Sequence, residues 1–243
     1  MELDGRVVLL TGAARRVGRA IALRLARAGC HLALHYRDSA TEAREVADAC
    51  RQMGVTVELF PTDLANDIQT SRLVPAVLDR FDQLDVLVNN AAEFRPMSLE
   101  SFALADWEHT LRVNLTAPMM LAHAARAALK RAGGYIVNIC DVATQRPWPN
   151  HLAYIVSKGG LDTLTYALAR AMAPEVNVVG IAPGAVAWPE NYDARQREIL
   201  TARIPLKRAG TVEDVAALVH FVLSAGEYIT GTIIPVDGGR HVV

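Results

Sequence analysis

The chain has 243 residues, of which 51% are hydrophobic and 21% are charged. This length and composition are ample for a large buried core and compatible with one domain, so we expect a soluble globular protein. The formal net charge is −1 with neutral histidines, and no basic excess indicates a nucleic-acid or anionic-membrane partner.

The three cysteines, Cys30, Cys50 and Cys140, form an odd set without the spacing of metal ligands. They indicate reduced thiols, and we expect no metal site. The first residues, Met-Glu-Leu-Asp, are acidic, and the apolar run V-V-L-L that follows is too short to span a bilayer. We therefore expect a cytoplasmic location.

Short runs rich in Val, Ile and Leu alternate with longer amphipathic segments, which is typical of a parallel sheet covered by helices. The predicted strands are residues 6–11, 31–36, 56–60, 85–89, 135–139, 176–181 and 232–236. The sequence therefore predicts an α/β fold with one Rossmann-type, doubly wound, parallel sheet of seven strands and helices on both faces, spanning residues 1–243. Ligands of such folds bind outside the carboxyl ends of the strands, so functional residues should directly follow the strands.

The first predicted strand leads into T-G-A-A-R-R-V-G, residues 11–18, which opens a helix that extends to Gly29. Glycines let the backbone approach a pyrophosphate, and a helix N-terminus offers unpaired amide donors and a favourable dipole. Arg16 stands where a third glycine is expected. Its cation either meets a phosphate, reaches into the substrate space or is simply solvated. We expect a dinucleotide to contact Gly12, Arg16, Val17 and Gly18.

Arg37 directly follows the second predicted strand, nineteen residues after Gly18. An acidic residue near this position binds the ribose hydroxyl of NAD, whereas an arginine accommodates the 2′-phosphate of NADP. We therefore favour NADPH, although Arg37 could also be a solvated loop residue and Asp38 would repel the phosphate if it pointed inward. Tyr36 ends the strand, and Ser39 offers a further hydroxyl donor.

Two further strand ends supply candidate cofactor contacts. After the third strand, Asp63 either accepts from the adenine amino group or caps the next helix, and Leu64 lies beside it. The fourth strand ends in N-N-A-A, residues 89–92, so Asn90 and Ala91 should lie at the cofactor. Predicted helices at 104–130 and 154–172 are apolar on more than one face, which favours an oligomer interface.

An acid, a phenol and an ammonium lie close together between the fifth and sixth strands. Asp141 precedes Tyr154 by thirteen residues, and Lys158 follows it by four. On a helix the last two share one face, where the ammonium should favour loss of the phenolic proton. This makes Tyr154 a candidate general acid, although pairs at this spacing also arise by chance.

Pro183 and Gly184 end the sixth strand and begin an irregular stretch. We interpret residues 185–203, which include Trp188, as a lid over the substrate. A plain surface excursion is the alternative. Trp148 and His151 precede the tyrosine and are further candidates for the pocket wall.

The motifs TGAARRVG, NNAA, Y-x-x-x-K and IAPGAV together resemble those of the short-chain dehydrogenase/reductase family, over essentially the whole chain. The resemblance implies a nicotinamide cofactor and usually a homotetramer. It also implies that Tyr154 and Lys158 are catalytic, that Lys158 holds the nicotinamide ribose, and that Asn114 helps to hold the lysine and a water in a proton path.

One departure from the family narrows the substrate. Most members carry a serine where this chain has Asp141, and an ionised carboxylate would repel a carbonyl oxygen. Arg16, the H-Y-R-D-S segment, Phe94 and Asp141 resemble the pteridine reductases, and A-P-E-V-N-V and D-G-G-R-H resemble the bacterial dihydromonapterin reductase branch. This implies NADPH-dependent reduction of a pterin, which Phe94 stacks on and which Arg16, Asp141, Tyr154 and Trp188 contact.

Two alternatives remain open. The first is a reductase of a carbonyl substrate on the same fold, such as a 3-oxoacyl thioester reductase or a sugar-alcohol dehydrogenase, since fold does not fix substrate. The second is a non-catalytic dinucleotide sensor that retains the scaffold.

Overall fold

The computed structural model describes residues 1–186 and 193–243. Its sheet has seven parallel strands in the order β3-β2-β1-β4-β5-β6-β7. The strands are β1 (Val7–Leu10), β2 (His31–Tyr36), β3 (Val57–Pro61), β4 (Val86–Asn89), β5 (Tyr135–Ile139), β6 (Asn177–Pro183) and β7 (Thr232–Val236). The predicted seven-stranded, doubly wound sheet is confirmed, with strand ends shifted by at most two residues.

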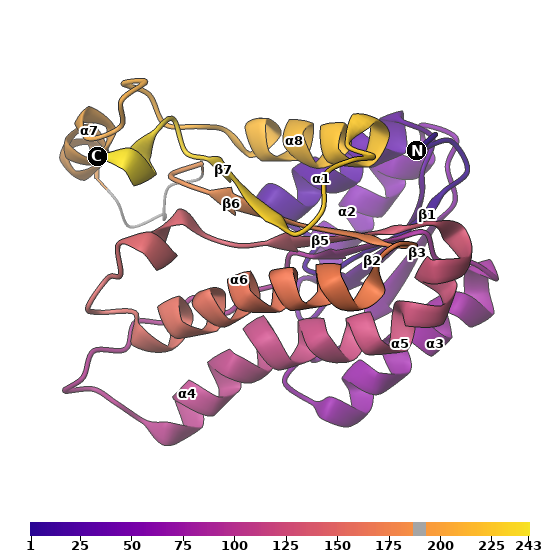
Figure 1. Ribbon diagram of the computed structural model, residues 1–243, viewed down its shortest axis with the longest axis horizontal. Coiled ribbons are helices and arrows are strands. Elements are labelled where there is room, and N and C mark those ends of the chain that lie inside the picture. The colour runs from indigo at the N-terminus through magenta and orange to yellow at the C-terminus, as the bar shows by residue number, and fades with distance from the viewer. Residues whose placement is uncertain (187–192) are drawn as a thin grey trace.

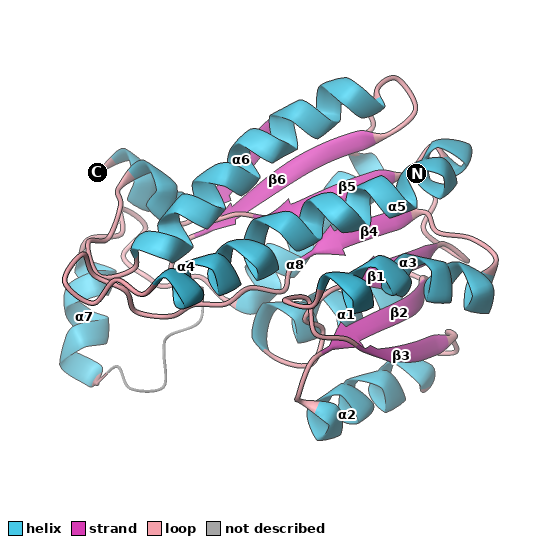
Figure 2. Ribbon diagram, turned by 90° about the horizontal axis from the view of Figure 1, so that it is seen from below, coloured by secondary structure: helices cyan, strands magenta, loops and turns pink. Residues whose placement is uncertain are grey.

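Helices cover both faces of the sheet (Figure 1). One layer holds α1 (Arg16–Arg27), α2 (Ala40–Arg51) and α8 (Val212–Ala225). The other holds α3 (Asp67–Phe81), α4 (Leu104–Leu111), α5 (Ala117–Ala132) and α6 (Leu152–Met172). In Figure 2 the second layer lies in front of the strands, and α7 (Ala194–Ala202) stands apart near the carboxyl end of the chain.

The side chains of β1 point alternately to the two faces of the sheet, and each set belongs to a separate hydrophobic core. Val8 and Leu10 pack with α1 and α8, while Val7 and Leu9 pack with α3 and α5. All four side chains are buried, as expected for a parallel strand covered on both sides. These two cores hold the sheet rigid, so its carboxyl edge offers a fixed platform for a site.

The strand order places β1 between β2 and β4. The chain winds outward from β1 to β3 and then returns to β4 on the other side of β1. This is the switch point of a doubly wound sheet, where a crevice opens between the diverging loops. The segments that follow β1, β2 and β4 therefore border one crevice.

The predicted helix at 104–130 is interrupted. A π-helical turn, Arg112–Thr116, joins α4 to α5, and it buries Val113 and Asn114. A π-turn carries one residue more than regular α-helix and is frequent at functional sites. The periodicity of the sequence alone did not reveal it.

The predicted lid at 185–203 is not wholly irregular. Its second half forms α7, which begins with a capping box between Asp193 and Gln196. Residues 187–192, which include Trp188, lie outside the described residues. In the part of the chain that the structure describes, no helix is both long and apolar enough to cross a membrane.

Candidate functional site

A cleft of about 830 Å³ follows the carboxyl edge of the sheet from the turn after β1 to the turn after β6. The predicted site residues that line it are Gly12, Arg16, Val17, Gly18, Tyr36, Arg37, Ser39, Asp63, Leu64, Asn90, Ala91, Phe94, Asp141, Tyr154, Lys158, Pro183 and Gly184. Trp148 and His151 also line it. The fold thus brings together, in one cleft, residues that the sequence scatters over 170 positions.

The glycine-rich loop after β1 turns tightly onto the start of α1. Gly12 has φ 65°, and a Cβ on Gly18 would lie 2.1 Å from the carbonyl oxygen of Gly12. Both positions therefore require glycine. The first residues of α1 line the cleft, so the helix N-terminus is available to a pyrophosphate. The loop fits the dinucleotide that its sequence indicates.

Asn90 holds this loop in place from β4. Its Nδ2 donates to the carbonyl oxygens of Thr11 and Gly12 at 2.9 and 3.0 Å. The hydroxyl of Thr11 accepts in turn from the backbone amides of Asn90 and Ala91. The predicted cofactor residue Asn90 thus shapes the cofactor loop.

His35 is a further support of the loop that sequence reasoning missed. Its Nδ1 accepts from the amide of Gly12 at 3.0 Å, and its Nε2 lies 2.9 Å from the carbonyl oxygen of Thr62. A backbone amide on Nδ1 requires the tautomer that carries its proton on Nε2. Burial lowers the pKa of His35 to about 4, so the ring is neutral at pH 7. A polar residue at a buried position of β2 was the available signal.

Asp141, Tyr154 and Lys158 meet at the opposite end of the cleft. The Tyr154 hydroxyl donates to Asp141 Oδ2 at 2.6 Å, while Asp141 Oδ1 accepts from the amide of Ala143 at 2.8 Å. Lys158 is 3% exposed, and its Nζ donates to the carbonyl oxygen of Ile139 at 2.6 Å. Asp141 is therefore fixed by two hydrogen bonds and aims one oxygen at the phenol.

The electrostatics of these residues differ from the expectation. Burial, followed by the charge and hydrogen bond of Asp141, raises the pKa of Tyr154 well above its ordinary value. The predicted lowering by Lys158 is wrong here, because burial disfavours the charged phenolate and the Asp141 carboxylate accepts from the hydroxyl at 2.6 Å. Burial also raises the pKa of Asp141 and lowers that of Lys158. The phenol therefore holds its proton firmly at neutral pH.

Asn114 does not line the cleft, but it hydrogen-bonds to two segments that do. Its Nδ2 donates to the carbonyl oxygen of Glu93 at 3.0 Å and to Ser157 Oγ at 2.9 Å, and its Oδ1 accepts from the Glu93 amide at 2.7 Å. Ser157 Oγ donates to the carbonyl oxygen of Tyr154 at 2.6 Å. Asn114 thus ties the segment after β4 to the helix that carries Tyr154 and Lys158.

The predicted platform Phe94 lies within an aromatic cluster. Its ring stacks on His151 with centroids 4.4 Å apart and meets Tyr154 edge-on at 4.7 Å. The ring of Trp148 is nearly perpendicular to it, with centroids 6.1 Å apart. One face of Phe94 is therefore covered by imidazole, so a flat ligand would have to use the other. Its stacking role stays a prediction.

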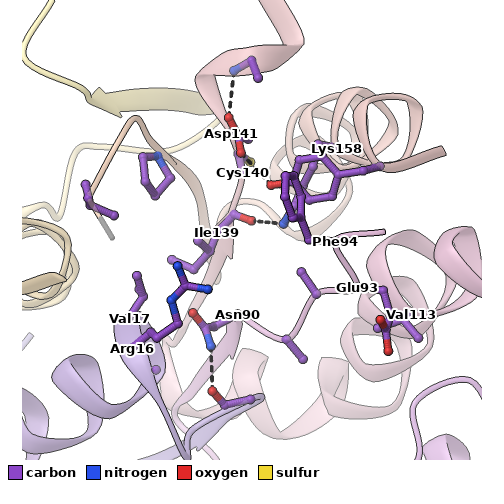
Figure 3. A pocket seen from close by; sticks show the side chains of 18 of the residues that line it. Arg16, Val17, Asn90, Glu93, Phe94, Val113, Ile139, Cys140, Asp141 and Lys158 are labelled. Carbon is purple, nitrogen blue, oxygen red and sulfur yellow. Dashed lines mark hydrogen bonds between the residues drawn. The ribbon is translucent and has the colours of Figure 1, made fainter. Parts of the chain in front are cut away.

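Arg16 reaches from the start of α1 towards the middle of the cleft, while Asp141, Lys158 and Phe94 line the far side (Figure 3). Its backbone φ is 51°, in the left-handed region that glycine occupies readily and an L-residue does not. This explains why a glycine was expected at this position. Unusual backbone of this kind is concentrated at functional sites.

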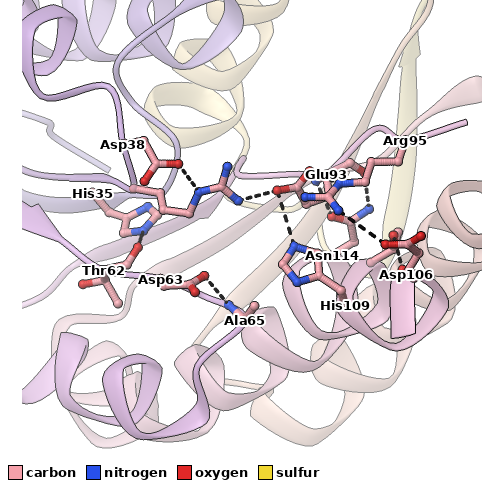
Figure 4. Close-up of polar contacts among 12 residues, drawn as sticks. His35, Asp38, Thr62, Asp63, Ala65, Glu93, Arg95, Asp106, His109 and Asn114 are labelled. Carbon is pink, nitrogen blue, oxygen red and sulfur yellow. Dashed lines mark hydrogen bonds and ion pairs between the residues drawn. The ribbon is translucent and has the colours of Figure 1, made fainter. Parts of the chain in front are cut away.

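Arg37 is paired on both sides. Its Nε donates to Asp38, and its Nη1 donates to Glu93, which sequence reasoning did not assign to the site. Glu93 also lies 3.3 Å from Arg95 and 3.5 Å from His109 (Figure 4). The acidic position in N-N-A-A-E-F was visible in the sequence, but its pairing with Arg37 depends on the fold.

Asp63 accepts from the amide of Ala65 at 2.9 Å. The cap of α3 is Asn66, which accepts from the amides of Ile68 and Gln69. The helix-capping alternative for Asp63 is therefore wrong, and its contact with adenine stays a prediction.

Known proteins match this chain over nearly its full length. A sequence profile of the family described as enoyl-(acyl carrier protein) reductase matches residues 12–241. The 3-oxoacyl-[acyl-carrier-protein] reductase of Synechocystis sp. is 35% identical over 243 residues, covering 98% of this chain and 97% of that protein. Glucose 1-dehydrogenase 2 of Bacillus subtilis is 30% identical over 249 residues, covering 98% and 95%.

Two solved structures match equally fully. A blue fluorescent protein from a metagenomic library, in complex with NADPH, has a TM-score of 0.92 and 31% identity, with 99% of each chain covered. A double mutant of a Serratia marcescens short-chain dehydrogenase/reductase has a TM-score of 0.92 and 30% identity, covering 99% of this chain and 100% of that one. None of these four proteins is named a pteridine reductase, so they give the expected pteridine branch no support.

Proposed function

Since the chain belongs to the short-chain dehydrogenase/reductase family of oxidoreductases, we propose that it is an NADPH-dependent reductase in which Tyr154 delivers a proton to the substrate. Bound NADPH supplies the hydride. The glycine loop would hold its pyrophosphate, Arg37 its 2′-phosphate and Lys158 its nicotinamide ribose. The NADPH named for one structural relative supports this choice of cofactor.

The substrate that best suits the site is a nitrogen heterocycle of the pterin class. The observation that carries this proposal is the carboxylate of Asp141, held 2.6 Å from the Tyr154 hydroxyl. An ionised carboxylate accepts hydrogen bonds and repels a carbonyl oxygen, whereas a ring N–H or an exocyclic amino group donates to it. The oxygen atoms that face the cleft therefore favour a donor-bearing ring over a ketone.

The chain's own residues provide a route for the proton. Tyr154 keeps its proton at neutral pH because burial and Asp141 raise its pKa, so the phenol is the group that can donate to a ring nitrogen. After Tyr154 has given its proton to the substrate, Asp141 can take up a proton from solvent and pass it to the phenolate, and the raised pKa of the carboxyl group favours this uptake. Lys158 adds positive charge behind the phenol as the proton leaves.

A 3-oxoacyl thioester is the second candidate substrate, and the names of the relatives favour it. The Synechocystis relative, at 35% identity, is a 3-oxoacyl-[acyl-carrier-protein] reductase, and the matching family carries the description of an acyl-carrier-protein reductase. In that case Asp141 would have to be protonated, so that it donates to the carbonyl oxygen instead of repelling it.

The deciding experiment follows NADPH oxidation with a dihydropterin, an oxidised pterin, dihydrofolate, a 3-oxoacyl thioester and a simple ketone. We expect turnover of the pterins only, and about a hundredfold loss of kcat/KM for oxidised pterin in Asp141→Ser. Tyr154→Phe should abolish turnover and leave the Kd for NADPH within about twofold.

Other outcomes point elsewhere. Turnover of the thioester with an unchanged or faster rate in Asp141→Ser would replace the pterin proposal with the second candidate. Binding of NADPH without turnover of any compound would favour the dinucleotide sensor.

A further inference from the structure

Glu93 and Arg37 form an ion pair between segments on opposite sides of the glycine loop. Arg37 directly follows β2, and Glu93 lies four residues beyond the end of β4. Since β1 lies between these two strands, the pair passes over the carboxyl end of β1, from which the loop emerges. Both side chains line the cleft, as Gly12 and Gly18 do.

The pair occupies the guanidinium that the proposed 2′-phosphate site would use. Arg37 is held by two carboxylates, Asp38 and Glu93, so an incoming phosphate has to displace a carboxylate from the guanidinium. The Asp38 side chain is 74% exposed and strongly screened by water, whereas that of Glu93 is only 16% exposed. Glu93 is therefore the stronger of the two competitors with an incoming phosphate for Arg37.

Glu93 also has other cationic or donor side chains beside it, one already bonded and one that, within the described part of the chain, is still without a bond. Arg95 Nε lies 3.3 Å from its second oxygen. His109 Nε2 lies 3.5 Å from the oxygen that bonds Arg37, and it is a buried nitrogen without a hydrogen-bond partner among the described residues. A small movement of the carboxylate towards His109 would satisfy that nitrogen. The backbone of Glu93 need not move, because Asn114 holds both its amide and its carbonyl.

We propose that Glu93 is a specificity-determining residue that competes with the 2′-phosphate of NADPH for Arg37 and so sets the ratio of NADPH to NADH affinity. The inference rests on the proposed use of Arg37 as the phosphate ligand. Binding of a 2′-phosphorylated cofactor exchanges the Glu93–Arg37 pair for a phosphate–Arg37 pair, and Glu93 keeps its bond to Arg95 and moves towards His109. NADH has no phosphate to make this exchange, so its affinity does not depend on the competition.

The test is the Kd of NADPH and NADH, measured by fluorescence titration without substrate, in wild type and Glu93→Gln. Glutamine keeps the shape and removes the charge. We expect NADPH to bind about fivefold more tightly to the variant and NADH to stay within about twofold. Adenosine 2′,5′-bisphosphate should also bind more tightly to Glu93→Gln than to wild type, whereas the affinity for AMP should not change. Asp38→Asn should show a smaller gain, because Asp38 is more exposed.

Glu108→Gln is the matched control, because Glu108 is an exposed residue of α4 outside the cleft lining. This variant removes one negative charge outside the cleft, so the Kd values of NADPH and NADH should both stay unchanged. Weaker NADPH binding in Glu93→Gln, or an equal change for both cofactors, would overturn the inference. The wild-type ratio of the two Kd values separately tests the proposed NADPH preference, so the two failures are distinguishable.

Discussion

Arg16 combines an unfavourable backbone with a side chain aimed at the cleft. Its φ of 51° costs roughly 1 kcal/mol relative to a right-handed conformation, and glycine at this position would avoid that cost. The chain carries an arginine instead, and the guanidinium lies on the wall that faces Asp141 and Phe94. We therefore expect the guanidinium of Arg16 to contact the ligand.

Replacing Arg16 by glycine and by alanine separates the backbone from the side chain. Both variants lose the guanidinium, so we expect both to raise the KM for a pterin by about tenfold. Only alanine keeps the strain, so Arg16→Gly should be more stable than Arg16→Ala by about 1 kcal/mol in urea denaturation. Equal stability would contradict the strain, and an unchanged KM in both would contradict contact with the substrate.

The imidazole of His35 connects two elements, because it joins the loop after β1 to the turn after β3. Its Nδ1 accepts from the Gly12 amide and its Nε2 donates to the Thr62 carbonyl oxygen, so protonation of Nδ1 breaks the bond to Gly12 and leaves the bond to Thr62. Burial lowers the pKa of the folded state to about 4 from the ordinary 6.5. The neutral ring therefore stabilises the fold above pH 6.5, and this contribution is lost as the pH falls towards 4.

The pH dependence of unfolding tests this brace. Between pH 7 and pH 5 we expect the wild type to lose about 2 kcal/mol of unfolding free energy through His35. His35→Gln keeps an acceptor and a donor but does not titrate in this range. Its unfolding free energy should therefore fall by about 2 kcal/mol less than that of the wild type over the same pH interval. Carboxylates contribute equally to both proteins and cancel in the difference. Parallel pH profiles would show that His35 is not the responsible group.

The elements themselves were largely predictable from the sequence. Strands such as Tyr135–Ile139 are short apolar runs between turns, and a parallel sheet buries them on both faces. Strand ends then located Gly12 and Arg37, and the spacing to Lys158 located Tyr154. The bracing residues were not predictable, because Glu93, His35 and Ser157 gain their roles from partners 56, 27 and 43 positions away. Nor could spacing show that the Tyr154 hydroxyl would bond to Asp141 while Lys158 bonds to the carbonyl oxygen of Ile139.

At the scale of the whole molecule, the cleft joins both halves of the sheet. Residues after β1, β2 and β3 line one part, and residues after β4, β5 and β6 line the other. A ligand that contacts both parts binds the folded chain and not the unfolded chain, so it should stabilise the molecule as a unit.

NADPH at about one hundred times its Kd should stabilise the fold by about 2.7 kcal/mol and raise the Tm by roughly 5–10 °C. Differential scanning fluorimetry measures this shift. Gly18→Ala is the control, because a Cβ there meets the Gly12 carbonyl oxygen and distorts the loop. A shift that persists in this variant would place the cofactor away from the loop.

The expected homotetramer stays a prediction. Apolar side chains remain exposed on the helices that suggested it, namely Met119 on α5 and Val156 and Tyr166 on α6. Their exposure is compatible with an interface along this layer, which the oligomeric state in solution would test.

The π-turn at Arg112–Thr116 makes the long helical segment intolerant of changes in length. One residue of α-helix advances the side chains by about 100°, so the extra residue sets α4 out of phase with α5. Deleting one residue there would restore regular helix and rotate everything before it by that angle relative to the sheet. Asn114 would then face away from Glu93 and Ser157. Single-residue deletions in this turn should therefore be far more harmful than substitutions at its exposed positions, in contrast to deletions in the surface loops.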